Sequence, residues 1–276
     1  MTPRTGLIGV LLLLGLGLAA WWWWPQAEPV VTLAAPQAAL VEPPATAASV
    51  AVPAVQFPLE TQAGASAPPS AQASDAVLKS ELIELAGKNG VLSFLQLDGF
   101  VRRVVVTVDN LDRVSASARL WPVVPAAGHF LASGEGEQMR IDADNGLRYA
   151  PFVQFIESID SARAVALYRW MYPLFQQSYQ ELGYPNRYFN DRLVQVIDHL
   201  LQTPVPPEPI AVTLTQIKGP VVSLRPWVHH SFTDPELEQR SAGQKLLMRM
   251  GNVNERRLKA KLIELRAQLV TQVVKR

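Results

Sequence analysis

The chain contains no cysteine. This absence excludes disulfide bonds, thiolate zinc sites, iron–sulfur clusters and thiol nucleophiles together. The first 74 residues also hold very little charge, because Arg4 is their only base and Glu28, Glu42 and Glu60 are their only acids. The sequence therefore divides into a nearly uncharged N-terminal part and a longer C-terminal part with ordinary globular chemistry.

Short motifs of common active sites are missing as well. The chain has no H-E-x-x-H zinc pattern, no G-x-S-x-G nucleophile turn and no histidine pair at metal-ligand spacing. We therefore expect no metal and no cofactor, and the sequence favours a binding or scaffold protein over an enzyme. Acid pairs such as Glu157 with Asp160 leave glycoside hydrolysis as an alternative, because two carboxylates at the right separation across a cleft perform that reaction.

An uncharged run of 19 residues extends from Gly6 to Trp24. As a helix this run is roughly 28 Å long, close to the hydrocarbon thickness of a bilayer. Four tryptophans at its end suit the lipid headgroup level, and Pro25 then stops the helix. We interpret residues 1–24 as a transmembrane anchor that is not cleaved, because Leu18 stands where a signal peptidase needs a small residue.

The charges on either side of the anchor predict its orientation. Arg4 precedes the apolar run, and the first charge after it is Glu28. The positive-inside bias therefore places the N-terminus in the cytoplasm and the rest of the chain on the other side of the membrane. The lipid bilayer is the first expected partner, through this N-terminal helix.

Residues 25–74 are rich in alanine and hold nine prolines. Proline removes backbone donors and biases the preceding residue towards extended geometry, so neither a helix nor a central strand is expected. We predict a disordered, semi-rigid linker whose length has a ceiling on the order of 150 Å, at about 3.1 Å per residue. It carries the following domain away from the bilayer and contributes no core to that domain.

Residues 75–276 form one predicted globular domain. They hold 24 basic and 21 acidic residues, a formal net charge of +3. This balance gives no argument for nucleic acid as a partner. Apolar residues recur at helical spacing in most of the domain, and helices are expected over 75–86, 100–111, 151–158, 161–182, 186–202, 235–238, 242–250 and 253–274.

Two short hairpins are expected between these helices. One pairs residues 129–132 with 138–141, and the other pairs the β-branched runs 210–217 and 221–228. We therefore assign the α+β class: a mainly α-helical soluble domain with one or two small β-hairpins, plus one N-terminal transmembrane helix.

Two helical faces allow both a structural and a functional interpretation. An aromatic stripe recurs at spacings of 4, 3 and 4 on the longest predicted helix: Tyr168, Tyr172, Phe175 and Tyr179. Such a stripe stacks on sugar rings or packs as core, and we favour core. The last helix carries five bases between residues 256 and 266. A docked amphipathic helix accounts for them, and a surface for an anionic polymer is the alternative.

Four segments of the domain are similar to a known family. They are Arg102-Arg103 through Leu111, Arg148-Tyr149 with Pro151, Leu182-Gly183-Tyr184-Pro185 through Leu193, and Ser241-Ala242-Gly243-Gln244-Lys245 through Gly251. They resemble a bacterial family of membrane-anchored proteins described only as a domain of unknown function, the three-thousand-and-fourteenth of that series. The resemblance covers roughly residues 75–270. It implies a location at the bacterial envelope and implies no reaction.

These observations lead to one main expectation about function. We expect a single-pass protein of the bacterial inner membrane, whose C-terminal domain lies in the periplasm and binds an envelope protein or a cell-wall polymer. The alternative is a hydrolase of such a polymer, with carboxylates in an unrecognised cleft.

Six polar or aromatic residues are the candidate binding residues: Arg148, Tyr149, Asn190, Asp191, Arg192 and Arg225. Two of them have a structural alternative. Asn190 can cap the helix that follows it, and Asp191 can favour the positive end of the same helix.

Overall fold

The computed structural model describes residues 54–59, 74–215 and 230–270. Within those ranges, no helix is both long and apolar enough to cross a bilayer. The predicted anchor, residues 1–24, and most of the predicted linker lie outside the described residues, so both stay predictions.

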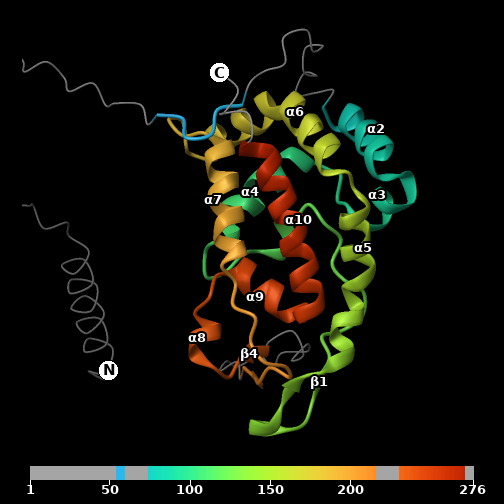
Figure 1. Cartoon of the computed structure of the whole chain (residues 1–276), viewed down its shortest axis with the longest axis vertical. Coiled ribbons are helices and arrows are strands. Elements are labelled where there is room, and N and C mark those ends of the chain that lie inside the picture. The colour runs from blue at the N-terminus through green and yellow to red at the C-terminus, as the bar shows by residue number, and fades with distance from the viewer. Residues whose placement is uncertain (1–53, 60–73, 216–229, 271–276) are drawn as a thin grey trace, which may run out of the picture. The chain divides into compact units, whose positions relative to one another are not determined.

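Helices dominate the described part of the chain, and two antiparallel strand pairs complete it (Figure 1). The α-helices are α2 (Ser74–Ala86), α3 (Lys88–Phe94), α4 (Phe100–Leu111), α5 (Ala150–Ser158), α6 (Ser161–Glu181), α7 (Phe189–Leu201), α8 (Pro235–Glu238), α9 (Ala242–Arg249) and α10 (Asn252–Val270). The strands are β1 (Ala132–Ser133), β2 (Arg140–Ile141), β3 (Val212–Leu214) and β4 (His230–Phe232). Short 3-10 helices are η1 (Ala118–Leu120), η2 (Gly136–Gln138) and η3 (Ala143–Arg148).

The sequence pattern does not predict α3. Gly90 lies inside this short helix and lowers its helix propensity. A Cβ at Gly90 would meet the Phe155 ring at 2.5 Å, so the glycine allows α3 to approach α5 closely. Tertiary packing, and not local helix propensity, therefore accounts for the formation of α3.

Helices α4, α6, α7 and α10 surround the main hydrophobic core (Figure 1). Helix α4 contributes Val101, Val105 and Val108, whose spacing of 4 and 3 places them on one face. Its predicted helical character is confirmed, although valine favours strands, because this valine face is buried against α6 and α7.

The aromatic stripe of α6 packs into this core, as predicted. Tyr179 is 1% exposed and Phe175 is 6% exposed. The Phe175 ring stacks on Phe189 of α7 at 5.8 Å between centroids. Tyr168 and Tyr172 are partly buried against the same cluster, so the stripe runs from the centre of the core to its edge.

Helix α9 meets the helical core through a glycine. Ser241 accepts a hydrogen bond from the Gln244 backbone N–H at 3.3 Å and caps this helix. A Cβ at Gly243 would lie 2.5 Å from Leu200 Cδ2 and 2.9 Å from the Leu111 carbonyl oxygen. The glycine therefore permits a close approach that places the end of α9 beside the hairpins.

The first predicted hairpin exists as a strand pair, and the first strand of the second pairs with a segment that the sequence did not predict. Strand β1 pairs with β2 as predicted. Strand β3 pairs with β4, with Val212 opposite Phe232, whereas the expected partner, residues 221–228, lies outside the described residues. The strand pairs also meet each other, because the Ile141 N–H donates to the Ile210 carbonyl at 2.9 Å.

The predicted linker contributes to the domain in one place. Residues 54–59 lie against it, and Phe57 packs on a cluster formed by Val165 of α6, Val194 and Ile197 of α7, and Leu269 of α10. This contact corrects the expectation that the linker adds nothing to the core. These residues lie in neither a helix nor a strand, so their backbone groups and the Phe57 ring are available for contacts with the domain.

Candidate functional site

Arg192 belongs to a buried ion network. Its guanidinium donates to both carboxylate oxygens of Asp112, at 2.7 and 2.6 Å, and its Nε lies 3.3 Å from Asp109 Oδ1. Arg113 Nη2 and the Tyr184 hydroxyl donate to the other Asp109 oxygen, at 2.5 and 3.2 Å. Burial opposes the charge of Arg192, but the hydrogen bond and the charge of Asp112 raise the pKa of Arg192. These contacts join α4 to α7 and give Arg192 a structural role.

Asn190 and Asp191 hold the linker segment. Asp191 accepts hydrogen bonds from two consecutive backbone N–H groups, of Gln56 at 3.0 Å and Phe57 at 2.8 Å. Asn190 is 1% exposed, and its Nδ2 donates to the Phe57 carbonyl at 2.8 Å. Asn190 does not cap α7, because that position belongs to Tyr188. The two predicted binding residues therefore recognise backbone of their own chain.

The other two described candidates, Arg148 and Tyr149, lie in a different part of the domain. They line a cavity of about 310 Å³ with His129, His230 and Arg249. Arg148 comes from the end of η3, and Arg249 comes from the end of α9. The sixth candidate, Arg225, lies outside the described residues.

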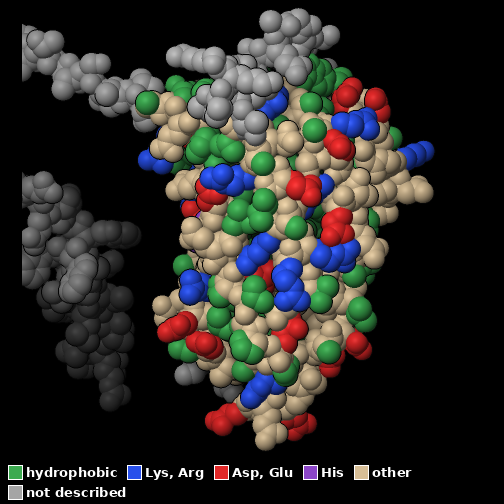
Figure 2. All heavy atoms as spheres, in the orientation of Figure 1, with side chains coloured by type: hydrophobic (Ala, Val, Ile, Leu, Met, Phe, Trp, Pro, Cys, Tyr) green, Lys and Arg blue, Asp and Glu red, His purple; other side chains and the backbone are tan. Residues whose placement is uncertain are grey.

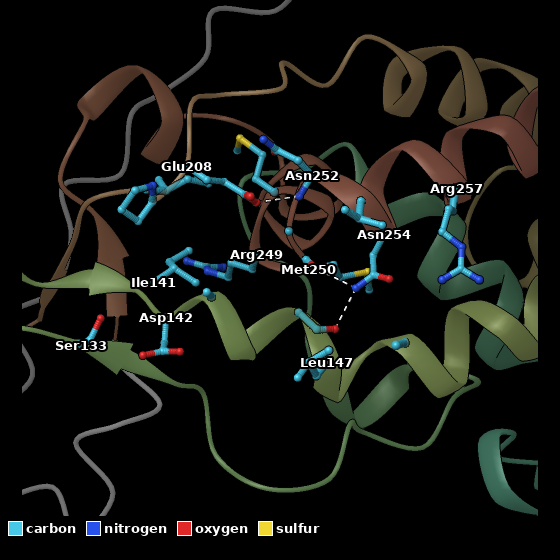
Figure 3. Close-up of a pocket in the computed structure, with 18 residues that line it drawn as sticks. Ser133, Ile141, Asp142, Leu147, Glu208, Arg249, Met250, Asn252, Asn254 and Arg257 are labelled. Carbon is cyan, nitrogen blue, oxygen red and sulfur yellow. Dashed lines mark hydrogen bonds between the residues drawn. The ribbon is translucent and has the colours of Figure 1, made fainter.

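A larger cavity of about 700 Å³ shares Arg249 as part of its wall (Figure 3). Its lining comes from η3 with the end of β2, from the loop around Glu208, and from the turn between α9 and α10. Most of the wall is apolar, and Leu147 and Val253 are 67% and 63% exposed. An open apolar cavity with a few polar groups is typical of ligand-binding sites.

The polar groups of the larger cavity are mostly engaged in the fold. Glu208 Oε1 accepts from the Asn252 backbone N–H at 2.7 Å, which fixes the first turn of α10 (Figure 3). Asp142 accepts from the Asp144 N–H at 2.9 Å and caps η3. The side-chain oxygen of Asn252 is buried and has no hydrogen-bond partner within the described residues.

Asn145 connects the two arginines that line the smaller cavity. It is fully buried, and its Oδ1 accepts from Arg148 Nη1 and from the Leu131 N–H, both at 3.0 Å. Its Nδ2 donates to the Arg249 carbonyl at 2.9 Å. One amide therefore fixes the position of the Arg148 side chain relative to the backbone of Arg249.

The acid pair Glu157 and Asp160 does not form a free pair of carboxylates. Glu157 receives a two-pronged hydrogen bond from Arg257, which lowers the pKa of Glu157. Asp160 accepts from the Arg163 N–H at 2.7 Å and caps α6. A general acid in glycoside hydrolysis needs a raised pKa, so the direction at Glu157 is the opposite of what that role requires.

The basic face of α10 is largely neutralised. Arg257 bonds Glu157, Lys259 lies 2.7 Å from Glu255, Lys261 lies 3.2 Å from Glu264, and Arg266 bonds Asp198. Figure 2 shows acidic and basic side chains interspersed on the face that includes α10. The interpretation as a docked amphipathic helix is therefore the better one.

The part of the chain that the structure describes contains no set of side chains that could bind a metal ion. Across residues 54–59, 74–215 and 230–270, no group of three or more His, Asp or Glu side chains is placed to hold a metal ion. His199 Nε2 lies 2.9 Å from Ser241 Oγ, at the cap of α9.

Sequence reasoning missed two residues that line the cavities, Glu208 and Arg249, and also Asn145, which bonds Arg148 beside the smaller one. Glu208, Asn145 and Arg249 have no neighbours in the sequence that suggest a site. Arg249 lies in a segment that resembles the family, and this is the one signal that could have drawn attention to it. In the structure, Arg249 lies at the same cavity as Arg148 and Tyr149, which belong to another of the segments that resemble the family.

Comparisons with known proteins give one match. A family model described as a protein of unknown function (DUF3014) matches residues 100–266. The match spans more than half of the chain, so the chain belongs to this family. It contains every residue that lines the two cavities. Comparisons with curated proteins and with solved structures found no match.

Proposed function

We propose that this member of the family is a binding protein of the bacterial envelope. Residues 1–24 anchor it in the inner membrane, residues 25–53 act as a spacer, and the domain stands in the periplasm. There it binds an envelope protein or a cell-wall polymer at the two cavities that share Arg249.

The observation that carries this proposal is the composition of the larger cavity. It is open and mostly apolar, and exposed Leu147 and Val253 are part of its lining. Its carboxylates Glu208 and Asp142 accept hydrogen bonds from the backbone of the protein itself. Such a wall offers contact area for a ligand, while its acids already have structural partners, which favours binding over hydrolysis.

A reporter fusion tests the location. Alkaline phosphatase joined after Arg276 is active only outside the cytoplasm, and a fluorescent reporter that matures only in the cytoplasm gives the complementary result. We expect active phosphatase and a dark fluorophore. The reverse pattern would overturn the topology and, with it, the choice of partners.

Two paired variants test the binding surface in cells. Leu147→Gln with Val253→Gln changes two exposed apolar residues of the cavity, and Val114→Gln with Ile263→Gln changes two residues exposed to a similar extent elsewhere. Substitutions at exposed positions usually change stability by less than about 0.5 kcal/mol. After crosslinking in intact cells, the first pair should lose bound partners and the second should keep them. Equal recovery from both would argue against the cavity as the binding surface.

A further inference from the structure

The arginines of this domain differ in how their charge is compensated. Arg113, Arg192, Arg257 and Arg266 each lie within ion-pair distance of a carboxylate. Arg249 has no such partner within the described residues, although it is partly buried. Removing a charge from water without a carboxylate partner is costly, so the partly buried guanidinium of Arg249 needs an explanation.

The neighbours of Arg249 do not neutralise it. Its Nη2 donates to the His230 carbonyl at 3.2 Å, and its guanidinium lies 4.9 Å from the centre of the Phe232 ring. Glu238 is the acid that attracts it, but Glu238 is engaged by the Lys245 ammonium at 3.0 Å and by the Phe232 N–H at 2.8 Å. Burial lowers the pKa of Arg249, yet a guanidinium keeps its proton at neutral pH.

A second arginine lines the same cavity. Arg148 donates to the carbonyl oxygens of Ala127 and Gly128, at 3.0 and 3.2 Å, and to Asn145. It has no carboxylate partner among the described residues either, because its three bonds go to neutral oxygens. A guanidinium has five N–H donors, so both arginines keep further donors for a ligand.

The sequence immediately before strand β4 contains basic residues and no acidic ones. Strand β4 begins at His230, and the preceding residues 215–229 contain Lys218 and Arg225 but no aspartate or glutamate. The sequence of that segment therefore supplies no acid that could pair with Arg249 or Arg148. A concave site lined by cations that have no carboxylate partner among the described residues attracts anions more strongly than a flat surface does.

We propose that the smaller cavity is an oxyanion site, in which the Arg249 and Arg148 guanidinium groups bind a carboxylate or phosphate group of the ligand. Planar guanidinium groups match the geometry of both groups and form two parallel hydrogen bonds with them. The site rests on the proposed binding function and specifies it: the ligand carries an anionic group that enters the smaller cavity, and its apolar part lies in the larger cavity beside it.

Titration with simple anions tests this site directly. The full chain in detergent is titrated with inorganic phosphate and, separately, with acetate, and thermal unfolding is followed at each concentration. Sodium chloride at matched ionic strength is the reference. An oxyanion that binds only the folded chain raises the melting temperature. We expect a saturable rise above the chloride reference, and the stronger of the two anions indicates whether the natural group is a phosphate or a carboxylate.

Variants of Arg249 distinguish a ligand-binding role from a structural one. Arg249→Gln should weaken anion binding about tenfold or more, because a charge-assisted hydrogen bond is lost. Arg249→Lys keeps the charge and should restore part of the binding. Arg240→Gln removes an exposed arginine and is the matched control, with unchanged binding expected.

Two results would overturn the proposal, and neither depends on how well a variant folds. The first is a wild-type chain whose melting temperature follows phosphate and acetate no more than chloride. The second is Arg249→Gln that binds both anions like the wild type. If either occurs while the Leu147→Gln and Val253→Gln pair still loses its partner in cells, the oxyanion site is wrong and the binding function stands. If the anions bind as expected but the Leu147→Gln and Val253→Gln pair keeps its partner in cells, the larger cavity is not the surface that binds the partner.

Discussion

Replacing Tyr179 by alanine tests the buried centre of the domain. Tyr179 is 1% exposed, its ring stacks on Tyr184 at 4.6 Å between centroids, and the Phe189 ring lies 5.6 Å away. Removing a ring of this size from a packed core costs about 3–5 kcal/mol. Tyr172 lies at the edge of the same cluster and is only partly buried, so Tyr172→Ala should cost about 1–2 kcal/mol, because less apolar area returns to water.

Urea unfolding followed by far-UV circular dichroism measures both changes. The midpoint should fall for both variants, with the larger loss of unfolding free energy for Tyr179→Ala, and the dependence of that free energy on urea concentration should be unchanged. Tyr179→Phe keeps the ring and its stacking and should lose less than about 1 kcal/mol. Wild-type midpoints for both alanine variants would refute the assignment of the stripe to the core and make it a candidate surface for a ligand.

Three further perturbations probe single contacts. Asp109→Asn and Arg192→Met should each destabilise the domain. A double-mutant cycle should give an interaction free energy of about 1–3 kcal/mol between the two residues. Additive losses of stability would show that their interaction contributes nothing. Phe57→Ala should release residues 54–59 and speed their cleavage by a protease, and an unchanged rate would argue against the docked linker. Burial raises the pKa of Glu255, against the effect of Lys259. The stability of the wild type relative to Glu255→Gln should therefore be highest below about pH 4. It should fall as the pH rises through the pKa that Glu255 has in the folded state. A difference that is constant with pH would contradict this assignment.

Periodicity predicts the helical faces of this domain well. The spacing of Val101, Val105 and Val108 and the stripe ending at Tyr179 are local patterns, and each places a buried face correctly. Helix α3 is the contrasting case. Gly90 argues against it locally, and only the approach to Phe155 explains why a glycine is needed there.

The cavities could not be predicted in the same way. Arg148, Glu208 and Arg249 are far apart in the sequence, and the fold alone brings their segments together. Arg249 has no carboxylate partner within the described residues, which is a property of its surroundings, and residue type and spacing carry no information about it. Arg192 shows the reverse error, since a charged residue in a motif suggested a site but its bonds to Asp112 serve the fold.

The linker shows how composition can hide a specific contact. Its prolines predict an extended chain, and most of that chain lies outside the described residues. Outside helix and strand, the N–H groups of Gln56 and Phe57 are free to reach Asp191. An acidic residue early in α7 has a common structural explanation, so nothing in the residue pattern suggests a peptide contact there.

Site-specific photocrosslinking in intact cells tests the central claim most directly. A photoreactive amino acid replaces Val253, which lines the larger cavity, or Ile263, which lies on the same helix outside it. These residues are 63% and 58% exposed, so access to solvent is nearly matched. We predict a specific crosslinked species from position 253 and none from position 263. Crosslinks of the same kind and yield from both positions, or from position 263 alone, would contradict the assignment of the cavity as the binding surface.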